Sequence, residues 1–139
     1  MTETADAQNA EPQDLAAYAA ARFAEALAGP REQLGERLFR MSLTAWENPD
    51  LRPQLLEKIR SAATSDAGAA RLRDHFSSML VERVGEVVEA PRLNLNAVVV
   101  QVVGVIMTRY VMKMEPIAST SVDELVETFA PTIQRYLDA

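Results

Sequence analysis

Very few residues of this chain could do chemistry. Its 139 residues include one histidine, His75, and no cysteine, so disulfides, thiolate catalysis and cysteine-ligated metals are excluded. A Ser-His-Asp arrangement would have to use His75. The sequence also lacks a glycine-rich phosphate loop, a Gly-x-Ser-x-Gly elbow and paired histidines at metal-ligand spacing. We therefore expect neither an enzyme nor a metal or cofactor site.

Two polar residues lie within apolar stretches and are candidates for binding. His75 lies between Leu72 and Met79, beside the apolar face of a predicted helix. We interpret it as a boundary histidine with a hydrogen bond, and the alternative is a polar contact inside a ligand cavity. Arg109 lies next to Tyr110 in the most apolar segment, where an unpaired guanidinium would be costly. Its partner is either a carboxylate of this chain, which we favour, or an anionic ligand.

Composition and charge indicate one soluble helical domain. Apolar residues make up 48% of the chain, glycines number five, and 14 basic residues stand against 20 acidic ones, for a net charge of −6. The basic residues are scattered, which argues against a nucleic-acid surface. Residues 1–14 are polar and acidic and do not resemble a signal peptide, so we expect a disordered tail and a cytoplasmic protein. The apolar run 97–107 is interrupted by Gln101 and shorter than the roughly 20 residues of a membrane span.

Apolar residues recur at three- and four-residue steps almost everywhere after the tail, which predicts an all-α fold of about six helices. The expected helices lie at 31–47, from Pro53 to Ala63, from the 64–66 cluster to about Val87, at 94–114 and at 121–137, after one helix that ends before Gly29. Residues 64–66 offer an N-cap, and Ser121 with Glu124 has the spacing of a capping box. Pro131 should kink the last helix or divide it into two pieces.

The predicted helix at 94–114 is apolar on nearly every side, so it must be covered all round. One stripe is bulky and is expected to face the home core: Val99, Val103, Ile106, Tyr110 and Met114. A second stripe is small and polar and is expected to meet a further helix closely: Ala97, Gln101, Gly104 and Thr108. In the alternative interpretation, both stripes are covered within one protomer.

Three stretches, Gly29–Arg40, Trp46–Ser61 and Arg109–Leu137, carry a family resemblance. In this order they resemble the C-terminal sensor and dimerisation domain of the Tet-repressor family, in an actinobacterial-type branch. The resemblance covers the chain from about Arg22 onward and implies one domain at 15–139. It also implies a homodimer in which the last two long helices of each protomer form a four-helix bundle. The resemblance and the apolar periodicity of these two helices together imply the following interface residues: Ala97, Gln101, Gly104, Thr108, Phe129, Ile133 and Tyr136.

The resemblance further implies a cavity for a small, largely apolar effector, enclosed by the helices before the dimerisation pair. The lining residues implied are Leu38, Met41, Trp46, Ile59, His75, Phe76, Met79, Leu80, Val103, Met107 and Tyr110. Thioether side chains repack readily, which suits loosely specified apolar ligands. From the sequence alone, these residues are predicted only to face inward.

Members of the family carry a three-helix DNA-binding head before this domain, and this sequence has no room for one. We therefore expect no DNA binding by this chain alone. An excised fragment, a shortened gene and a natural headless protein are all compatible with that expectation. The alternative function is a headless interaction protein that forms heterodimers with an intact regulator and modulates its DNA binding.

Overall fold

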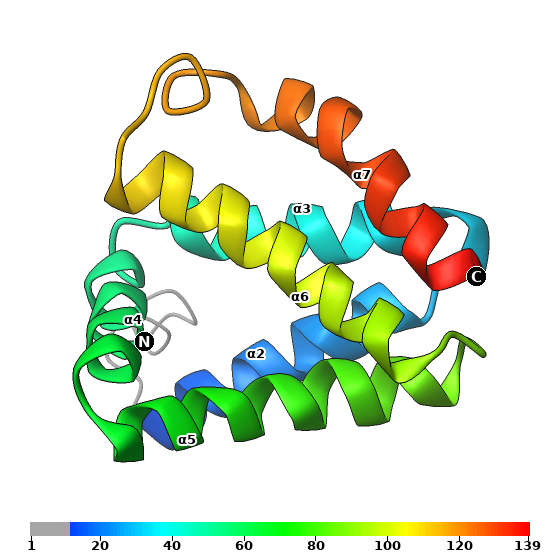
Figure 1. Cartoon of the computed structure of the whole chain (residues 1–139), viewed down its shortest axis with the longest axis horizontal. Coiled ribbons are helices and arrows are strands. Elements are labelled where there is room, and N and C mark those ends of the chain that lie inside the picture. The colour runs from blue at the N-terminus through cyan, green and yellow to red at the C-terminus, as the bar shows by residue number, and fades with distance from the viewer. Residues whose placement is uncertain (1–11) are drawn as a thin grey trace, which may run out of the picture.

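The computed structural model describes residues 12–139, and in that range six α-helices follow one another without a β-strand (Figure 1). They are α2 (Pro12–Leu27), α3 (Leu34–Glu47), α4 (Arg52–Thr64), α5 (Asp66–Phe76), α6 (Arg92–Ile106) and α7 (Val122–Asp138). The predicted all-α fold is confirmed. Residues 1–11, which include most of the predicted acidic tail, lie outside the described range.

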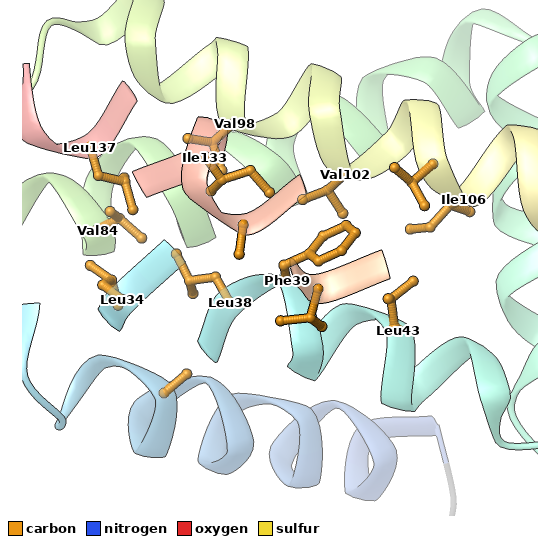
Figure 2. Close-up of a cluster of buried hydrophobic side chains, with 14 of the residues drawn as sticks. Leu34, Leu38, Phe39, Leu43, Val84, Val98, Val102, Ile106, Ile133 and Leu137 are labelled. Atoms are coloured by element: carbon orange, nitrogen blue, oxygen red, sulfur yellow. The ribbon is translucent and has the colours of Figure 1, made fainter. Parts of the chain in front are cut away.

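Helix α3 is the centre of the domain. It contacts α2, α4, α6 and α7, and a 3-10 turn, η1 (Arg31–Gln33), precedes it. Its inner face holds Leu34, Leu38, Phe39 and Leu43, which point toward valines of α6 and toward Ile133 and Leu137 of α7 (Figure 2). These side chains are almost wholly removed from water. Burial of this shared apolar surface is the main force that holds the three helices together.

The start of α3 lies very close to the end of α7. A Cβ atom built on Gly35 would lie 2.8 Å from the backbone nitrogen of Gln134. The Gly35 N–H donates to Oε1 of Gln134 (2.7 Å), and Nε2 of Gln134 donates to the carbonyl of Arg31 (2.9 Å). One side chain of α7 therefore accepts from a backbone N–H in the first turn of α3, where such groups lack a partner within the helix, and also donates to a carbonyl of η1.

Helices α4 and α5 follow one another around a corner at one end of the domain and run across each other in Figure 1; we call this pair the α4–α5 hairpin. Pro53 lies in the first turn of α4, and Ser65 caps α5 by accepting from the N–H of Gly68 (3.0 Å), as the sequence predicts. A Cβ on Gly68 would clash with the side chain and carbonyl of Ser61. The corner between the two helices is therefore tight.

Two segments that the periodicity predicts as regular helix are π-helical. After Phe76, α5 continues as η2 (Ser77–Arg83, π-helix) and η3 (Val84–Glu86, 3-10), and α6 continues as η4 (Met107–Val111, π-helix). At the end of η4, the N–H of Met112 donates to the carbonyl of Met107, five residues back (2.8 Å). A π-helical turn changes the face on which later residues lie. The predicted inner faces therefore change phase within η2 and η4.

The face of α6 that meets the core differs from the predicted one. The buried residues are Leu95, Val98, Val102, Val105 and Ile106. Val99 and Val103 are only half-buried and Met114 is exposed, so the bulky stripe was assigned wrongly except for Ile106 and Tyr110. Valine occupies so many positions of this helix that the apolar pattern favours several faces almost equally.

Helix α7 is a single helix that contains Pro131, as one of the two alternatives predicted, and the alternative of two separate pieces is excluded. Its N-terminus has the predicted cap, because Ser121 Oγ accepts from the N–H of Glu124 (3.2 Å). Ser121 Oγ also donates to the Glu124 carboxylate (3.1 Å). The apolar face of the helix packs on α3 and α6.

Residues 92–111, which are α6 and η4, form one helix that is long and apolar enough to cross a membrane by length and composition. The apolar run 97–107 is thus part of a longer helix, and one such helix is weak evidence for a membrane span. The same test is passed by core helices of soluble proteins. One face of this helix packs in the core against α3 and α7, and Arg109 forms an ion pair with Glu47.

Candidate functional site

The residues predicted to line a ligand cavity fall into three groups. Leu38, Trp46 and Tyr110 are part of the buried core. His75 is exposed on the surface of α5. The others are half-buried: Met41, Ile59, Phe76, Met79, Leu80, Val103 and Met107. The structure thus places most of the set at the boundary between core and solvent.

The half-buried residues belong to a region where helices are incompletely covered. Helix α4 has no buried residue, although Leu55, Leu56 and Ile59 pack against the core from one side. Segment η2 has none either, and its Met79 and Leu80 are also half-buried. In contrast, α3, α6 and α7 contribute five or six buried residues each. The α4–α5 side is therefore the loosely packed side of the domain.

The two best-formed hollows among the described residues lie elsewhere on the surface. One, of about 330 Å³, is lined by Arg31, Glu32, Glu89, Leu137, Asp138 and Ala139, and the other, of about 340 Å³, by Ala62, Ala63, Thr64, Ser65, Asp66 and Ala69. Neither contains a residue of the predicted cavity. The second lies at the α4–α5 corner. The apolar ligand cavity stays a prediction.

A polar cluster joins the end of α3 to the end of α6. The Glu47 carboxylate accepts from the Tyr110 hydroxyl (2.6 Å) and from Nη2 of Arg109 (3.2 Å). The Arg109 side chain is 9% exposed, and its Nη1 donates to the carbonyls of Ile117 and Thr120 (2.8 and 2.6 Å). The predicted internal carboxylate partner of Arg109 is confirmed. The guanidinium also holds the loop between α6 and α7 in place.

Aromatic rings complete this cluster. The rings of Trp46 and Tyr110 stack with centroids 5.3 Å apart, and the Arg52 guanidinium lies 5.1 Å from the centre of the Tyr110 ring. Nε of Arg52 donates to the carbonyl of Trp46 (2.7 Å). Three chain segments, the end of α3, the start of α4 and the end of η4, therefore meet at Tyr110.

The cluster perturbs the ionisation of two of its members. The hydrogen bond from Tyr110 is the largest influence on the Glu47 carboxyl and lowers its pKa, with help from Arg109 and Arg52 against the opposing effect of burial. Burial, followed by the hydrogen bond to Glu47, raises the pKa of Tyr110 to about 12. At neutral pH, Glu47 is thus a carboxylate and Tyr110 a neutral donor, a pair that holds the fold together.

His75 forms no hydrogen bond with the described residues. Its ring contacts the edge of Phe76, with centroids 5.6 Å apart. Partial burial lowers its pKa, and the positive charge of Lys58 adds to that effect. The interpretation of His75 as a boundary histidine holds for its position at the surface, but the expected hydrogen bond is missing. No group of three or more potential metal ligands occurs in the described residues.

The predicted dimer residues are placed differently on α6 and α7. Gly104 is exposed, and a Cβ built on it would meet nothing within 4 Å. The other residues of the small stripe, Ala97, Gln101 and Thr108, are half-buried, as are Phe129 and Tyr136 of α7. Ile133 is 0% exposed. A partner subunit cannot reach Ile133, so we leave it out of the interface proposed below.

The structure shows exposed apolar residues on α6 that the sequence interpretation missed. Leu93 is 76% exposed and Val100 is 66% exposed, and Val111 of η4 is also exposed. Leu93 and Val100 are seven residues apart and lie on the same side of α6 as Gly104, which follows Val100 by four residues. This seven-residue spacing could have been found in the sequence. The neighbouring valines concealed it.

Comparisons with known proteins agree with this architecture. The family model described as "Tetracyclin repressor-like, C-terminal domain" matches residues 32–137. A solved structure of a TetR-family regulator from Streptomyces coelicolor A3 is similar, with a TM-score of 0.61 and 26% sequence identity, over 83% of this chain and 78% of that chain. No curated protein matches the chain. Because the family model spans most of its length, the chain belongs to the tetracyclin repressor-like C-terminal domain family of transcriptional regulators.

Proposed function

We propose that this chain is the effector-sensing and dimerisation part of a Tet-repressor-like regulator, and that it acts as a homodimer. Family membership supports a regulatory role and a dimer in general. The structural observation that supports the homodimer is that the outward face of α6 is apolar and exposed. Leu93 and Val100 are large, apolar and mostly exposed on a helix that has no described neighbour on that side. Such a face is stabilised by covering it with a partner.

The effector site that we propose lies under the α4–α5 hairpin. Met41 of α3, Ile59 of α4 and Met79 of η2 are half-buried and pack against the core from its loosely packed side. An apolar molecule that enters there would replace contacts that are already incomplete. The absence of charged residues from this set favours a largely apolar ligand. Ligand binding would shift the hairpin relative to α3 and α6.

Ligand binding can be followed without a label, because Trp46 is the single tryptophan of the chain and stacks on Tyr110 at the edge of this region. We expect small apolar compounds to change Trp46 fluorescence in a saturable way. Met79→Glu, which places a charge in the proposed lining, should abolish the response. The matched control Met114→Glu changes an exposed methionine after α6 and should leave it intact. Equal responses in both variants would refute the proposed location.

We propose that residues 1–139 do not bind DNA by themselves. Their net charge is −6, and several of the basic side chains, such as those of Arg40, Arg60 and Arg109, are engaged with carboxylates of the chain. A gel-shift titration with operator-like DNA should show no sequence-specific complex. A specific, salt-resistant complex would contradict this proposal. We also propose a cytoplasmic location without membrane association, and no enzymatic activity.

The second candidate function is a heterodimer with an intact regulator of the same family. The exposed α6 face favours it, because that face is available to any partner with a complementary helix pair. A full-length relative mixed with this chain would then exchange subunits, and native mass spectrometry would show the mixed species. Persistence of the two homodimers alone would remove this candidate.

A further inference from the structure

Residues 66–86 form one continuous helix whose hydrogen-bond pattern changes twice (Figure 1). The regular helix α5 passes into the π-helical η2, where bonds span five residues, and then into the 3-10 segment η3, where they span three. At both junctions, from Phe76 to Ser77 and from Arg83 to Val84, the backbone keeps right-handed helical dihedral angles. A wide turn followed by a tight one inside an unbroken helix is typical of a functional hinge.

The two ends of this helix are held by different parts of the domain. Val84 of η3 is 0% exposed, and the guanidinium of Arg83 lies over the ring of Phe23 in α2, 5.0 Å from its centre. Among the residues of α5, all of which the structure describes, Gly68 alone is buried, and it lies against Ser61 of α4. The end of the helix is therefore fixed to the core, and its beginning is fixed to α4.

Segment η2, between these two ends, packs on the core without burying any residue. Met79, Leu80 and Val81 are all half-buried against the core, and η2 contacts α6. Successive residues of a regular α-helix point about 100° apart, so three in a row do not share one face. The wider π-helical turn brings them closer to one side. Shallow contacts of flexible side chains can be exchanged at small cost when the helix moves.

The α4–α5 hairpin is linked to the rest of the chain at two places, and both lie beside a π-helical segment. One is η2, and the other is the short turn between Glu47 and Arg52. Nε of Arg52 donates to the carbonyl of Trp46 (2.7 Å), and its guanidinium lies over the ring of Tyr110 in the π-helical η4. The hairpin is therefore a unit with a deformable helix next to each of its two links.

We infer that η2 and η3 form a joint about which the α4–α5 hairpin moves relative to α3, α6 and α7. A π-helical turn holds more residues than an α-helical turn, so the return of η2 to regular turns would lengthen the helix and rotate α5 about its axis. Val84 would stay in the core, while Met79 and Leu80 would change their depth beneath the hairpin. The idea that an effector drives this movement rests on the proposed function, whereas the joint itself needs no ligand.

A deletion tests the joint, because a π-helical turn carries a residue that a regular helix does not need. Deletion of Ser78, which is exposed in η2, should make the segment α-helical while α5 and Val84 keep their faces. We expect an unchanged helical circular dichroism spectrum and an unchanged or higher thermal midpoint. The matched control is deletion of Glu57, exposed on α4, because Leu55 and Ile59 can then no longer face the core together. This control should lower the midpoint by at least about 4 °C.

Hydrogen exchange measures the movement itself. In the natural chain, the amides of residues 77–83 should exchange at least about tenfold faster than those of α6, and deletion of Ser78 should remove most of this difference. Exchange as slow as in α6, or a Ser78 deletion as damaging as the Glu57 deletion, would overturn the joint. Saturating toluene, as an apolar probe, should slow exchange in residues 77–83 of the natural chain. Failure of toluene alone would contradict the proposed effector site, whereas the deletion results would still support the joint.

Discussion

At the scale of single residues, the main structural feature is the meeting of Glu47, Arg109 and Tyr110. The sequence predicts that Arg109 has an internal carboxylate partner, because a guanidinium in an apolar helix is costly without one. It does not identify Glu47, which is 62 residues away, because the choice depends on where α3 and α6 end in space. The loop carbonyls that Arg109 also binds are equally invisible in the sequence.

Removing the Glu47 charge should destabilise the domain. Glu47→Gln leaves Arg109 without its carboxylate, and we expect a loss of about 1–2 kcal/mol in the free energy of unfolding. The expected loss is smaller than for a fully buried pair because the Glu47 side chain is 40% exposed. The control is Glu57→Gln, whose pair with Arg60 is well exposed and should contribute less than about 0.5 kcal/mol. Urea unfolding should separate the two variants, and equal losses would contradict the role of the cluster.

The raised pKa of Tyr110 predicts a loss of stability at high pH. Its value of about 12 in the folded protein exceeds that of a free tyrosine, about 10, so the fold favours the neutral phenol. The resulting stabilisation is fully present below about pH 10 and is lost as the pH rises toward 12. Urea midpoints from pH 8 to 11.5 should fall less steeply for Tyr110→Phe than for the natural chain. The control Tyr136→Phe should show the same steep fall of the urea midpoint as the natural chain. A steep fall in Tyr110→Phe as well would contradict the assignment of this pH dependence to Tyr110.

At the scale of elements, the existence and order of the helices follow from apolar periodicity, and the caps at Ser65 and Ser121 follow from residue type. The two π-helical segments do not follow from the sequence, because a helical turn can widen by one residue without any change in the apolar composition. The phase of α6 also could not be predicted, since its many valines provide several equivalent faces. The ligand cavity and the dimer interface stay predictions, and the exposed Leu93 and Val100 were missed.

The close approach of α3 and α7 requires a glycine at position 35. In Gly35→Ala the new methyl group would press on the backbone of Gln134, which cannot move aside as a flexible side chain could. We expect the free energy of unfolding to fall by about 1–3 kcal/mol. Gly85→Ala is the matched control, because its Cβ would lie 3.7 Å from Leu95, an ordinary contact. Equal thermal or urea stability of the two variants would show that α3 and α7 are not this close.

At the scale of the whole molecule, the domain has a well-packed side and a loosely packed side. Helices α3, α6 and α7 share the buried core, whereas α4 and η2 contribute no buried residue. This division suits a protein that must keep a fixed dimer surface while another part responds to a ligand. The outward face of α6, with Leu93 and Val100, belongs to the well-packed side, so the proposed dimer would be maintained while the α4–α5 hairpin moves.

The most direct test of this account is the mass of the native protein in solution. Native mass spectrometry, with light scattering at tens of micromolar, should show a homodimer of the 15.3 kDa chain. Val100→Glu, which places a charge on the exposed apolar face of α6, should give a folded monomer with an unchanged helical circular dichroism spectrum. A natural chain that is monomeric, or a Val100→Glu variant that stays fully dimeric, would contradict the assignment of α6 as the dimer surface.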